Sequence, residues 1–304
     1  MKVLICDPVS TKCLEFLKGA GLEVSYQPKI SAEDLIKQIP DYDVVIVRSR
    51  TKITSPVIEA GKKLKVIGRA GIGLDNIDME AASKKNIIVV NTPESSTQAV
   101  AELTIGLMLN LARKITLGDR GIKEGLWLKS EMMGIELNGK TLGIIGLGRI
   151  GSRVGTLAKA FGMKILVNDV APLPEQLIKS LEAEVVDLDT LLSRSDFVTL
   201  HVPLTPQTRH MMNRERLAKM KKGAYLINTS RGEVVDEEAL YEAIKEGRLA
   251  GAALDVFEHE PPTSKVVKLP NVVCTPHIGA QTVEAQDAAG EMLAKKIICA
   301  LGLR

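Results

Sequence analysis

The stretch Thr141-Leu142-Gly143-Ile144-Ile145-Gly146-Leu147-Gly148-Arg149-Ile150-Gly151 decides the fold of this chain. An apolar run leads directly into the spacing Gly146-x-Gly148-x-x-Gly151, and a helical pattern follows through Phe161. In such a turn the first glycine permits a tight bend and the second lets a pyrophosphate approach the backbone. The third lets helix and strand pack closely, and the free N–H groups of the helix attract phosphates. The stretch therefore predicts a strand, a turn and a helix that bind a dinucleotide.

The cofactor is expected to be NAD because of the acid that follows the next predicted strand. Asp169 lies 18 residues beyond Gly151, about where a carboxylate binds the ribose hydroxyls of NAD. A carboxylate there repels the 2′-phosphate of NADP, and no arginine occurs in the following residues 170–172. The alternatives are a purely structural glycine turn and, for Asp169, a surface turn residue.

Strand-like and helical patterns alternate on both sides of a long apolar helix expected at 97–115. Strand-like runs before it are 2–6, 22–26, 43–47, 64–67 and 87–90, with helical stretches such as 31–38 and 79–85 between them. Strand-like runs after it are 141–145, 164–168, 197–200, 224–228, 251–254 and 272–274, and a last helix is expected at 282–301. This alternation predicts an α/β protein with two parallel-sheet domains.

Size and composition agree with a cytoplasmic enzyme of two domains. The chain has 304 residues, 25% of them charged, and a net charge of only +3, so nothing demands nucleic acid or a membrane surface. Its longest apolar stretch, near 99–112, is interrupted by Glu102 and Asn110 and is shorter than the roughly 20 residues that span a bilayer. No cysteine pair or histidine cluster has ligand spacing, so no metal is expected. We expect reduced core cysteines at Cys6, Cys13, Cys274 and Cys299.

Three further segments follow predicted strands in the second half of the chain. They are Asn228-Thr229-Ser230-Arg231-Gly232, Asp255-Val256-Phe257-Glu258-His259-Glu260-Pro261-Pro262 and Thr275-Pro276-His277-Ile278-Gly279. Ligands of open parallel sheets bind beyond the carboxyl ends of the strands. An arginine, a glutamate and a histidine are therefore expected at the ligand edge of one sheet.

These residue types suit the oxidation of an alcohol. A histidine can accept the hydroxyl proton as hydride leaves, a carboxylate beside it can hold its tautomer, and an arginine can bind a substrate carboxylate and polarise a keto oxygen. We expect His277 as general acid/base, Glu260 as its partner and Arg231 as the anchor. His259 and Glu258 are rival candidates, and purely structural roles are the alternative for all of them.

With these motifs, and with His201-Val202-Pro203-Leu204-Thr205-Pro206-Gln207-Thr208, the sequence resembles the D-isomer-specific 2-hydroxyacid dehydrogenases over nearly its whole length. The resemblance implies NAD as cofactor and places the family's catalytic triad on Arg231, Glu260 and His277. The implied cofactor contacts are Gly146, Gly148, Arg149, Ile150, Gly151, Asp169, His201, Val202, Pro203, Thr208, Thr229, Ser230, Arg231, Asp255, His277 and Gly279.

The resemblance also implies the arrangement of the domains. A flavodoxin-like substrate domain would comprise 1–95 and 283–304, and a Rossmann NAD-binding domain would be inserted at 96–282, with a cleft between them. Family members are typically homodimers that pair through their nucleotide domains, so helix 97–115 is expected at that interface. A dimer of dimers is the alternative assembly.

Within the family, the sequence is most similar to members that oxidise D-3-phosphoglycerate in serine biosynthesis. Such a substrate adds about two negative charges, which Arg48 and Arg69 after their strands could bind. The expected substrate contacts are Arg48, Ser49, Arg69, Gly71, Ile72, Gly73, Arg231 and His277. Ile72 and the segment 94–97 depart from the usual pattern, and solvated loop cations at Arg48, Arg50 and Arg69 are the alternative.

Two other functions stay open from the sequence. One is a glyoxylate or hydroxypyruvate reductase of the same family, which needs no pair of arginines for a phosphate. The other, more remote, is a non-catalytic NAD-sensing corepressor. The 304 residues hold no serine-sensing regulatory domain, so we expect no inhibition by serine through such a domain.

Overall fold

The computed structural model describes residues 1–303, which form two compact units. Unit 1 is made of two pieces of chain, Met1–Thr97 and the residues from Ala280 onward, and unit 2 is Gln98–Gly279. Unit 2 is thus inserted into unit 1, and each unit has its own parallel sheet.

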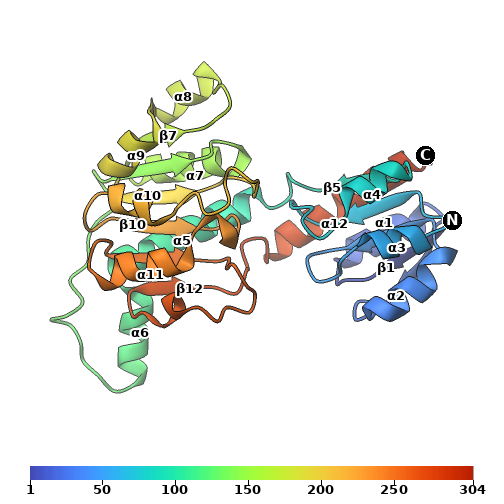
Figure 1. Cartoon of the computed structure of the whole chain (residues 1–304), viewed down its shortest axis with the longest axis horizontal. Coiled ribbons are helices and arrows are strands. Elements are labelled where there is room, and N and C mark those ends of the chain that lie inside the picture. Colours follow the sequence, from blue (N-terminus) through green and yellow to red (C-terminus); the bar gives the residue numbers. More distant parts are fainter. Residues whose placement is uncertain (304) are drawn as a thin grey trace. The chain divides into compact units, whose positions relative to one another are not determined.

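The sheet of unit 1 has five parallel strands in the order β2-β1-β3-β4-β5. Figure 1 labels β1 and β5 of this sheet. The five strands are β1 (Lys2–Ile5), β2 (Glu23–Tyr26), β3 (Val44–Val47), β4 (Val66–Arg69) and β5 (Ile88–Asn91). This is the flavodoxin-like order, in which the direction of the chain across the sheet reverses between β1 and β3. The structure confirms the expected fold of this unit.

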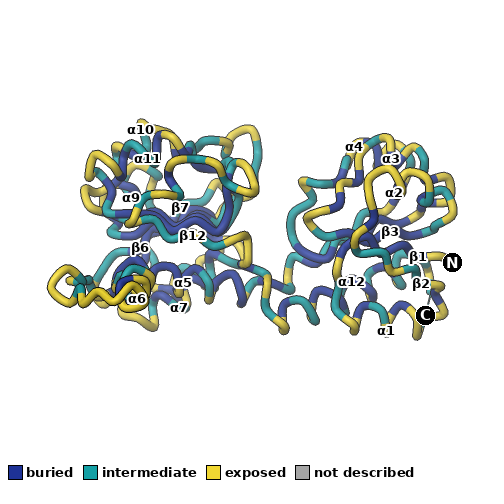
Figure 2. The backbone as a smooth tube through the Cα atoms, turned by 90° about the horizontal axis from the view of Figure 1, so that it is seen from below, coloured by how far each residue is buried: buried dark blue, intermediate teal, exposed yellow. Residues whose placement is uncertain are grey.

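Helices cover both faces of that sheet (Figure 2). On one face lie α2 (Ala32–Gln38), α3 (Ser55–Ala60) and α4 (Met79–Lys84), and on the other lie α1 (Thr11–Gly19) and α12 (Val283–Ala300). The alternation along β3 explains this layering, because Val45 and Val47 pack toward the first set of helices and Val44 and Ile46 toward the second. Strands buried on both faces read as the unbroken apolar runs seen in the sequence.

The sheet of unit 2 has seven parallel strands in the order β12-β11-β10-β9-β6-β7-β8. They are β6 (Thr141–Ile145), β7 (Lys164–Asn168), β8 (Glu184–Val185), β9 (Phe197–Leu200), β10 (Tyr225–Asn228), β11 (Gly251–Leu254) and β12 (Val272–Cys274). The order reverses between β6 and β9, as in the doubly wound dinucleotide-binding fold. This confirms the Rossmann fold expected for the second half of the chain.

Helices again cover both faces of the sheet of unit 2 (Figure 2). One face carries α9 (Leu188–Arg194), α10 (Arg214–Lys219) and α11 (Glu237–Lys245), and the other carries α5 (Thr97–Arg113) and α7 (Arg149–Ala160). The short α8 (Glu175–Leu181) precedes β8. These helices bring two apolar clusters onto the two faces of the strands, and the site loops emerge from the strand ends between them.

Two expectations from the sequence need correction. The long helix expected at 97–115 ends at Arg113, because Lys114 adopts a left-handed backbone (φ +54°) and α6 (Ile115–Lys123) begins beyond it. Cys6 and Cys13 are buried as expected, but Cys274 and Cys299 are exposed, so they are not core residues. Within residues 1–303, no helix is long and apolar enough to cross a membrane.

Candidate functional site

The glycine turn between β6 and α7 leaves no space for side chains. Gly146 has φ +92°, a backbone that favours glycine, and a Cβ there would lie 2.5 Å from the carbonyl oxygen of His201. A Cβ on Gly151 would lie 2.1 Å from the carbonyl oxygen of Gly146. The turn therefore brings bare backbone to the N-terminus of α7, where Arg149 and Ile150 form the first turn. This geometry suits a pyrophosphate.

Asp169 is attached to this turn through its carboxylate. Its Oδ2 accepts the N–H of Leu147 at 2.7 Å, and its Oδ1 accepts the N–H of Ala171 at 2.9 Å. The acid that the sequence places at the end of β7 thus lies directly beside the glycine turn. This position fits a group that binds the ribose next to a pyrophosphate.

The end of β9 brings His201, Val202 and Pro203 to the same edge. The N–H of His201 donates to Ile145, and its Nε2 lies 3.0 Å from the hydroxyl of Thr199. Burial lowers the pKa of His201 to about 3, so its ring is neutral at physiological pH. Its Nδ1 is buried and has no hydrogen-bond partner among the described residues, which leaves a polar atom available for a bound cofactor. Thr208 is partly buried, and its hydroxyl donates to the carbonyl oxygen of Pro203 at 2.7 Å.

The loops that carry the candidate catalytic residues begin at aligned strand ends. Asn228 at the end of β10 pairs with Leu254 at the end of β11, and Leu254 pairs with Cys274 at the end of β12. The segments that follow, with Arg231, Glu260 and His277, therefore start side by side at one edge of the sheet. The expectation drawn from parallel strands is met by this register.

The structure brings His277 and Glu260 together. Nδ1 of His277 lies 2.9 Å and 3.0 Å from the two carboxylate oxygens of Glu260. His277 also adopts a left-handed backbone (φ +53°), a conformation that non-glycine residues rarely adopt and that occurs at functional sites. The rival Glu258 instead lies 3.4 Å from Nε2 of His210. Glu258 and the exposed His259 line another pocket of unit 2 together with His210.

Asp255 fixes the loop that presents His277. Its buried carboxylate accepts the hydroxyl of Thr275 at 2.6 Å and the N–H groups of Ile278 and Gly279 at 2.8 Å and 2.9 Å. Its carbonyl oxygen accepts the N–H of His277 at 2.8 Å. Asp255 and Gly279, expected as cofactor contacts, thus also shape the backbone around the histidine.

Arg231 follows β10, and its backbone is held by the strand end itself. The carbonyl oxygen of Arg231 accepts a hydrogen bond from the side-chain amide of Asn228, whose Oδ1 accepts the N–H and hydroxyl of Ser230. The hydroxyl of Thr229 lies 3.0 Å from that of Thr104 in α5, a buried contact that the sequence did not reveal. The sequence signal that could have revealed this contact was Thr104, a polar residue on the apolar face of the predicted helix.

The candidate substrate residues of unit 1 follow β3 and β4. Arg48 comes directly after β3 and is partly buried, whereas Ser49 is exposed. Arg69 ends β4, and its guanidinium lies against Gly71, where a Cβ would be 1.6 Å from Nη1. Gly71 therefore leaves the space that this arginine occupies. The neighbouring Ile72 and Gly73 are partly exposed, and the side-chain amide of Asn91 donates to the carbonyl of Ile72 at 2.6 Å.

Comparison with known proteins identifies the family. Residues 105–279 match the NAD-binding domain of the D-isomer specific 2-hydroxyacid dehydrogenases. The chain belongs to this family. Its NAD-binding domain is the inserted unit 2, which carries the glycine turn and the His277–Glu260 pair.

Two relatives have different names at nearly equal similarity. A D-3-phosphoglycerate dehydrogenase of Methanocaldococcus jannaschii is 52% identical over 299 residues, covering 98% of this chain but 57% of that protein. A hydroxypyruvate reductase of Thermotoga maritima is 51% identical over 307 residues, covering 99% of both chains. The chain thus spans little more than half the length of this phosphoglycerate dehydrogenase and nearly all of the reductase.

A solved structure shows the same fold. The D-lactate dehydrogenase of Aquifex aeolicus, complexed with NAD and lactic acid, superposes with a TM-score of 0.86 at 33% identity. The match covers 99% of this chain and 96% of that one. The matched NAD-binding domain and the NAD in that structure support NAD as the cofactor, as expected from the sequence.

Proposed function

We propose that this chain oxidises D-3-phosphoglycerate to 3-phosphohydroxypyruvate with NAD, the first step of serine biosynthesis. One observation supports this substrate above others of the family: Arg48 and Arg69 stand at the carboxyl ends of neighbouring strands in unit 1. A phosphoryl group carries about two negative charges at neutral pH, and arginine binds it with two parallel hydrogen bonds. The proposal assigns the phosphate to these arginines and the reacting carbon to the residues of unit 2.

The catalytic step follows from the chemistry of the three side chains. His277 takes the proton of the substrate hydroxyl on Nε2, since its Nδ1 faces Glu260 at 2.9 Å. Glu260 holds the ring orientation and stabilises the imidazolium that forms. Arg231 binds the substrate carboxylate and favours the developing keto oxygen. When bound, NAD supplies the two-electron acceptor for the hydride.

Reduction of hydroxypyruvate or glyoxylate is the second candidate. It is favoured by the Thermotoga maritima hydroxypyruvate reductase, of whose length this chain covers 99%. Both reactions use the same acid/base pair, so the recognition of the phosphate separates them. A separate experiment tests the non-catalytic corepressor. If the chain is a dehydrogenase, His277→Ala should lower kcat by about 10²–10⁴-fold, the usual contribution of general acid–base catalysis. Such a loss of rate would exclude a corepressor without catalysis.

The test compares substrates on the wild-type chain and two variants. We expect NAD-dependent turnover of 3-phosphoglycerate, and Arg48→Ala and Arg69→Ala should each raise its KM about 10–100-fold. This range corresponds to about 1.5–3 kcal/mol per charged hydrogen bond. Fast NADH-dependent reduction of glyoxylate with no turnover of 3-phosphoglycerate would assign the chain to the reductases. Unchanged KM values in both variants would remove the phosphate assignment.

We also propose that the chain forms a homodimer through unit 2. Five of the nine exposed large apolar residues of unit 2 lie on α6 and the segment after it, and none lies on α5, more than half of which is buried. Trp127 and Met133 are 80% and 83% exposed, and Ile115 and Ile122 of α6 are more than half exposed. Aromatic residues and methionine are enriched at protein interfaces. A second copy of this chain is the proposed cover for this surface.

A further inference from the structure

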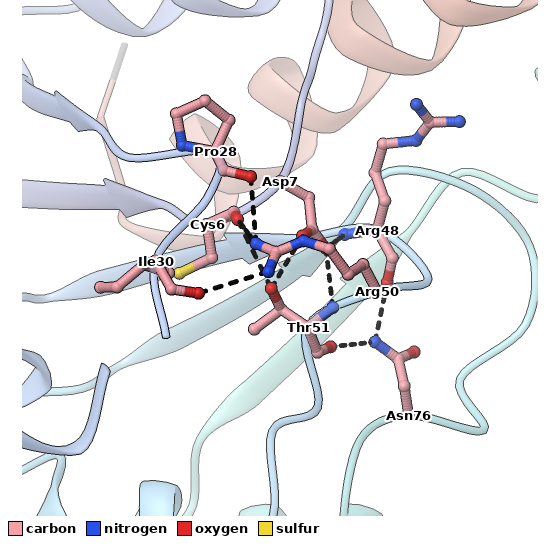
Figure 3. Close-up of polar contacts among 8 residues, drawn as sticks. All are labelled: Cys6, Asp7, Pro28, Ile30, Arg48, Arg50, Thr51 and Asn76. Carbon is pink, nitrogen blue, oxygen red and sulfur yellow. Dashed lines mark hydrogen bonds and ion pairs between the residues drawn. The ribbon is translucent and has the colours of Figure 1, made fainter. Parts of the chain in front are cut away.

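The segment 48–51, which follows β3, is held at both of its ends by one carboxylate (Figure 3). Asp7, just beyond β1, is fully buried. It accepts the backbone N–H of Arg48 at 2.6 Å and that of Thr51 at 3.1 Å. It also accepts the hydroxyl of Thr51 at 2.7 Å. The two ends of the segment therefore cannot move independently of the end of β1.

Asn76 completes the arrangement by bonding the carbonyl groups of the same two residues. Its side-chain nitrogen donates to the carbonyl oxygen of Arg48 at 2.7 Å and to that of Thr51 at 2.6 Å. Asp7 thus accepts hydrogen bonds from the N–H groups of Arg48 and Thr51, and Asn76 donates hydrogen bonds to their carbonyl groups. The backbone of Arg48 and Thr51 is fixed by two side chains from separate parts of unit 1.

The two arginines of the segment have different environments. Figure 3 shows the guanidinium of Arg50 inside the cluster and the side chain of Arg48 extended away from it. Arg50 donates to the carboxylate of Asp7 at 3.0 Å and to the carbonyl oxygens of Cys6, Pro28 and Ile30. Arg50 is therefore bonded into the cluster, although 51% of its side chain is exposed to solvent. Its charge balances the buried carboxylate.

Arg48 is left with a neutral partner and a net positive charge. Its Nη2 donates to the side-chain oxygen of Gln281, in the second piece of unit 1, at 2.7 Å. Partial burial lowers the pKa of Arg48, an effect that the nearby Asp7 opposes. A partly buried cation bonded to an uncharged amide is favourably placed to receive an anion.

The position of Asp7 and Arg48 in the sheet of unit 1 also indicates a ligand site. β1 and β3 are neighbours, and the order of the strands reverses between them. Ligands of doubly wound sheets bind beyond the carboxyl ends at such a reversal. Asp7 and Arg48 follow these two strands, so the cluster stands where a ligand of unit 1 is expected.

We propose that Asp7 and Asn76 are positioning residues for the phosphoryl group of the substrate. They fix the backbone of 48–51, so that the Arg48 guanidinium is already in place when the phosphoryl group arrives. An arginine that starts from an ordered backbone loses less conformational freedom on binding, and preorganisation of this kind improves affinity. This inference rests on the proposed oxidation of 3-phosphoglycerate and adds to it the residues that make Arg48 effective.

The first experiment replaces Asn76 with alanine and separates KM from kcat. Asn76→Ala removes both hydrogen bonds to the carbonyl groups of the segment. We expect the KM for 3-phosphoglycerate to rise about tenfold, and kcat and the KM for the unphosphorylated hydroxypyruvate to stay within about twofold. Lys85→Ala is the matched control, because Lys85 also donates to two carbonyl groups of unit 1, those of Ile58 and Glu59. It should change neither KM.

A conservative pair at Thr51 tests the contribution of Asp7. Thr51→Val removes the hydroxyl that donates to Asp7, and Thr51→Ser retains it. We expect the valine variant to raise the KM for 3-phosphoglycerate severalfold and the serine variant to restore it. This pair also decides the proposal if Asn76→Ala does not fold.

A double-mutant cycle separates positioning from general stability. In an Arg48→Ala background, Asn76→Ala should add no further rise in KM, because the group that it positions is absent. A rise in both backgrounds, or an equal rise for hydroxypyruvate, would overturn the proposal. If Arg48→Ala raises KM and Asn76→Ala and Thr51→Val do not, the positioning role fails and the proposed function stands. If Arg48→Ala leaves the KM for 3-phosphoglycerate unchanged, the positioning role fails; if Arg69→Ala also leaves it unchanged, the phosphate assignment of the proposed function fails too.

Discussion

Replacing Gly232 with alanine tests whether the spacing of two loops sets the reaction geometry. A Cβ on Gly232 would lie 1.9 Å from the carbonyl carbon of Phe257, although real Cβ atoms essentially never come within 3.0 Å of other atoms. The backbones would have to separate by roughly 1 Å. Arg231 precedes Gly232, and Glu260 lies three residues beyond Phe257. The substitution therefore moves the anchor away from the acid/base pair.

The magnitude follows from this displacement. A misplacement of about 1 Å can cost about 100-fold in rate, which is about 2.7 kcal/mol of transition-state stabilisation. We expect kcat/KM for 3-phosphoglycerate to fall about 100-fold. The Kd for NADH should change less than about threefold, since the glycine turn belongs to another strand. Steady-state kinetics and a fluorescence titration with NADH measure the two quantities.

Gly106→Ala is the control for this substitution. Gly106 lies in α5, and a Cβ there would have no heavy atom within 4 Å. Alanine should leave kcat/KM unchanged and raise the stability of unit 2 by up to about 1 kcal/mol, the difference in helix propensity. Circular dichroism checks that both variants fold. A folded Gly232→Ala enzyme with the kcat/KM of the wild type would refute the argument from loop spacing.

Three further predictions concern other parts of unit 2. Glu260→Gln removes the carboxylate that lies 2.9 Å from Nδ1 of His277. It should lower kcat by about 10²-fold or more, with little change in the Kd for NADH. A variant with the kcat of the wild type would exclude Glu260 as the partner of His277. Because the pKa of His201 falls from 6.5 to about 3 on folding, the unfolded state binds the extra proton, and the free energy of unfolding should decrease as pH falls below about 6.5. His201→Gln should flatten this part of the stability profile, and NMR should find the ring neutral at pH 5. Trp127→Glu should convert the dimer to a monomer by light scattering, and an unchanged mass would place the interface elsewhere.

The sequence was most informative about strands. The central strands of unit 2 are buried on both faces and bounded by glycine or polar residues, and the ends of β6, β7, β9, β11 and β12 agree with the expected ranges. The end of α5 was missed, because a left-handed lysine at 114 carries no signal comparable to glycine or proline. Backbone strain of this kind depends on tertiary packing that no local pattern records.

Part of the candidate site could also be predicted from the sequence. Strand ends and residue types were enough to bring Arg231, Glu260 and His277 to one edge of the sheet. The contact between His277 and Glu260, and the pairing of Glu258 with His210, require the actual course of the loops. Asp7 was not singled out, because its partners lie more than 40 residues away and become visible only in the folded sheet.

The discontinuous construction of unit 1 has a consequence for the order of synthesis. Leu293, Ala294 and Ile297 of α12 complete the apolar cluster on one face of its sheet. A ribosome makes these residues only after all of Gln98–Gly279, which at about 5–20 residues per second takes roughly 10–40 s. During that interval the newly made strands of unit 1 expose an apolar face to water. We expect unit 2 to fold first and the nascent unit 1 to be the part that chaperones protect.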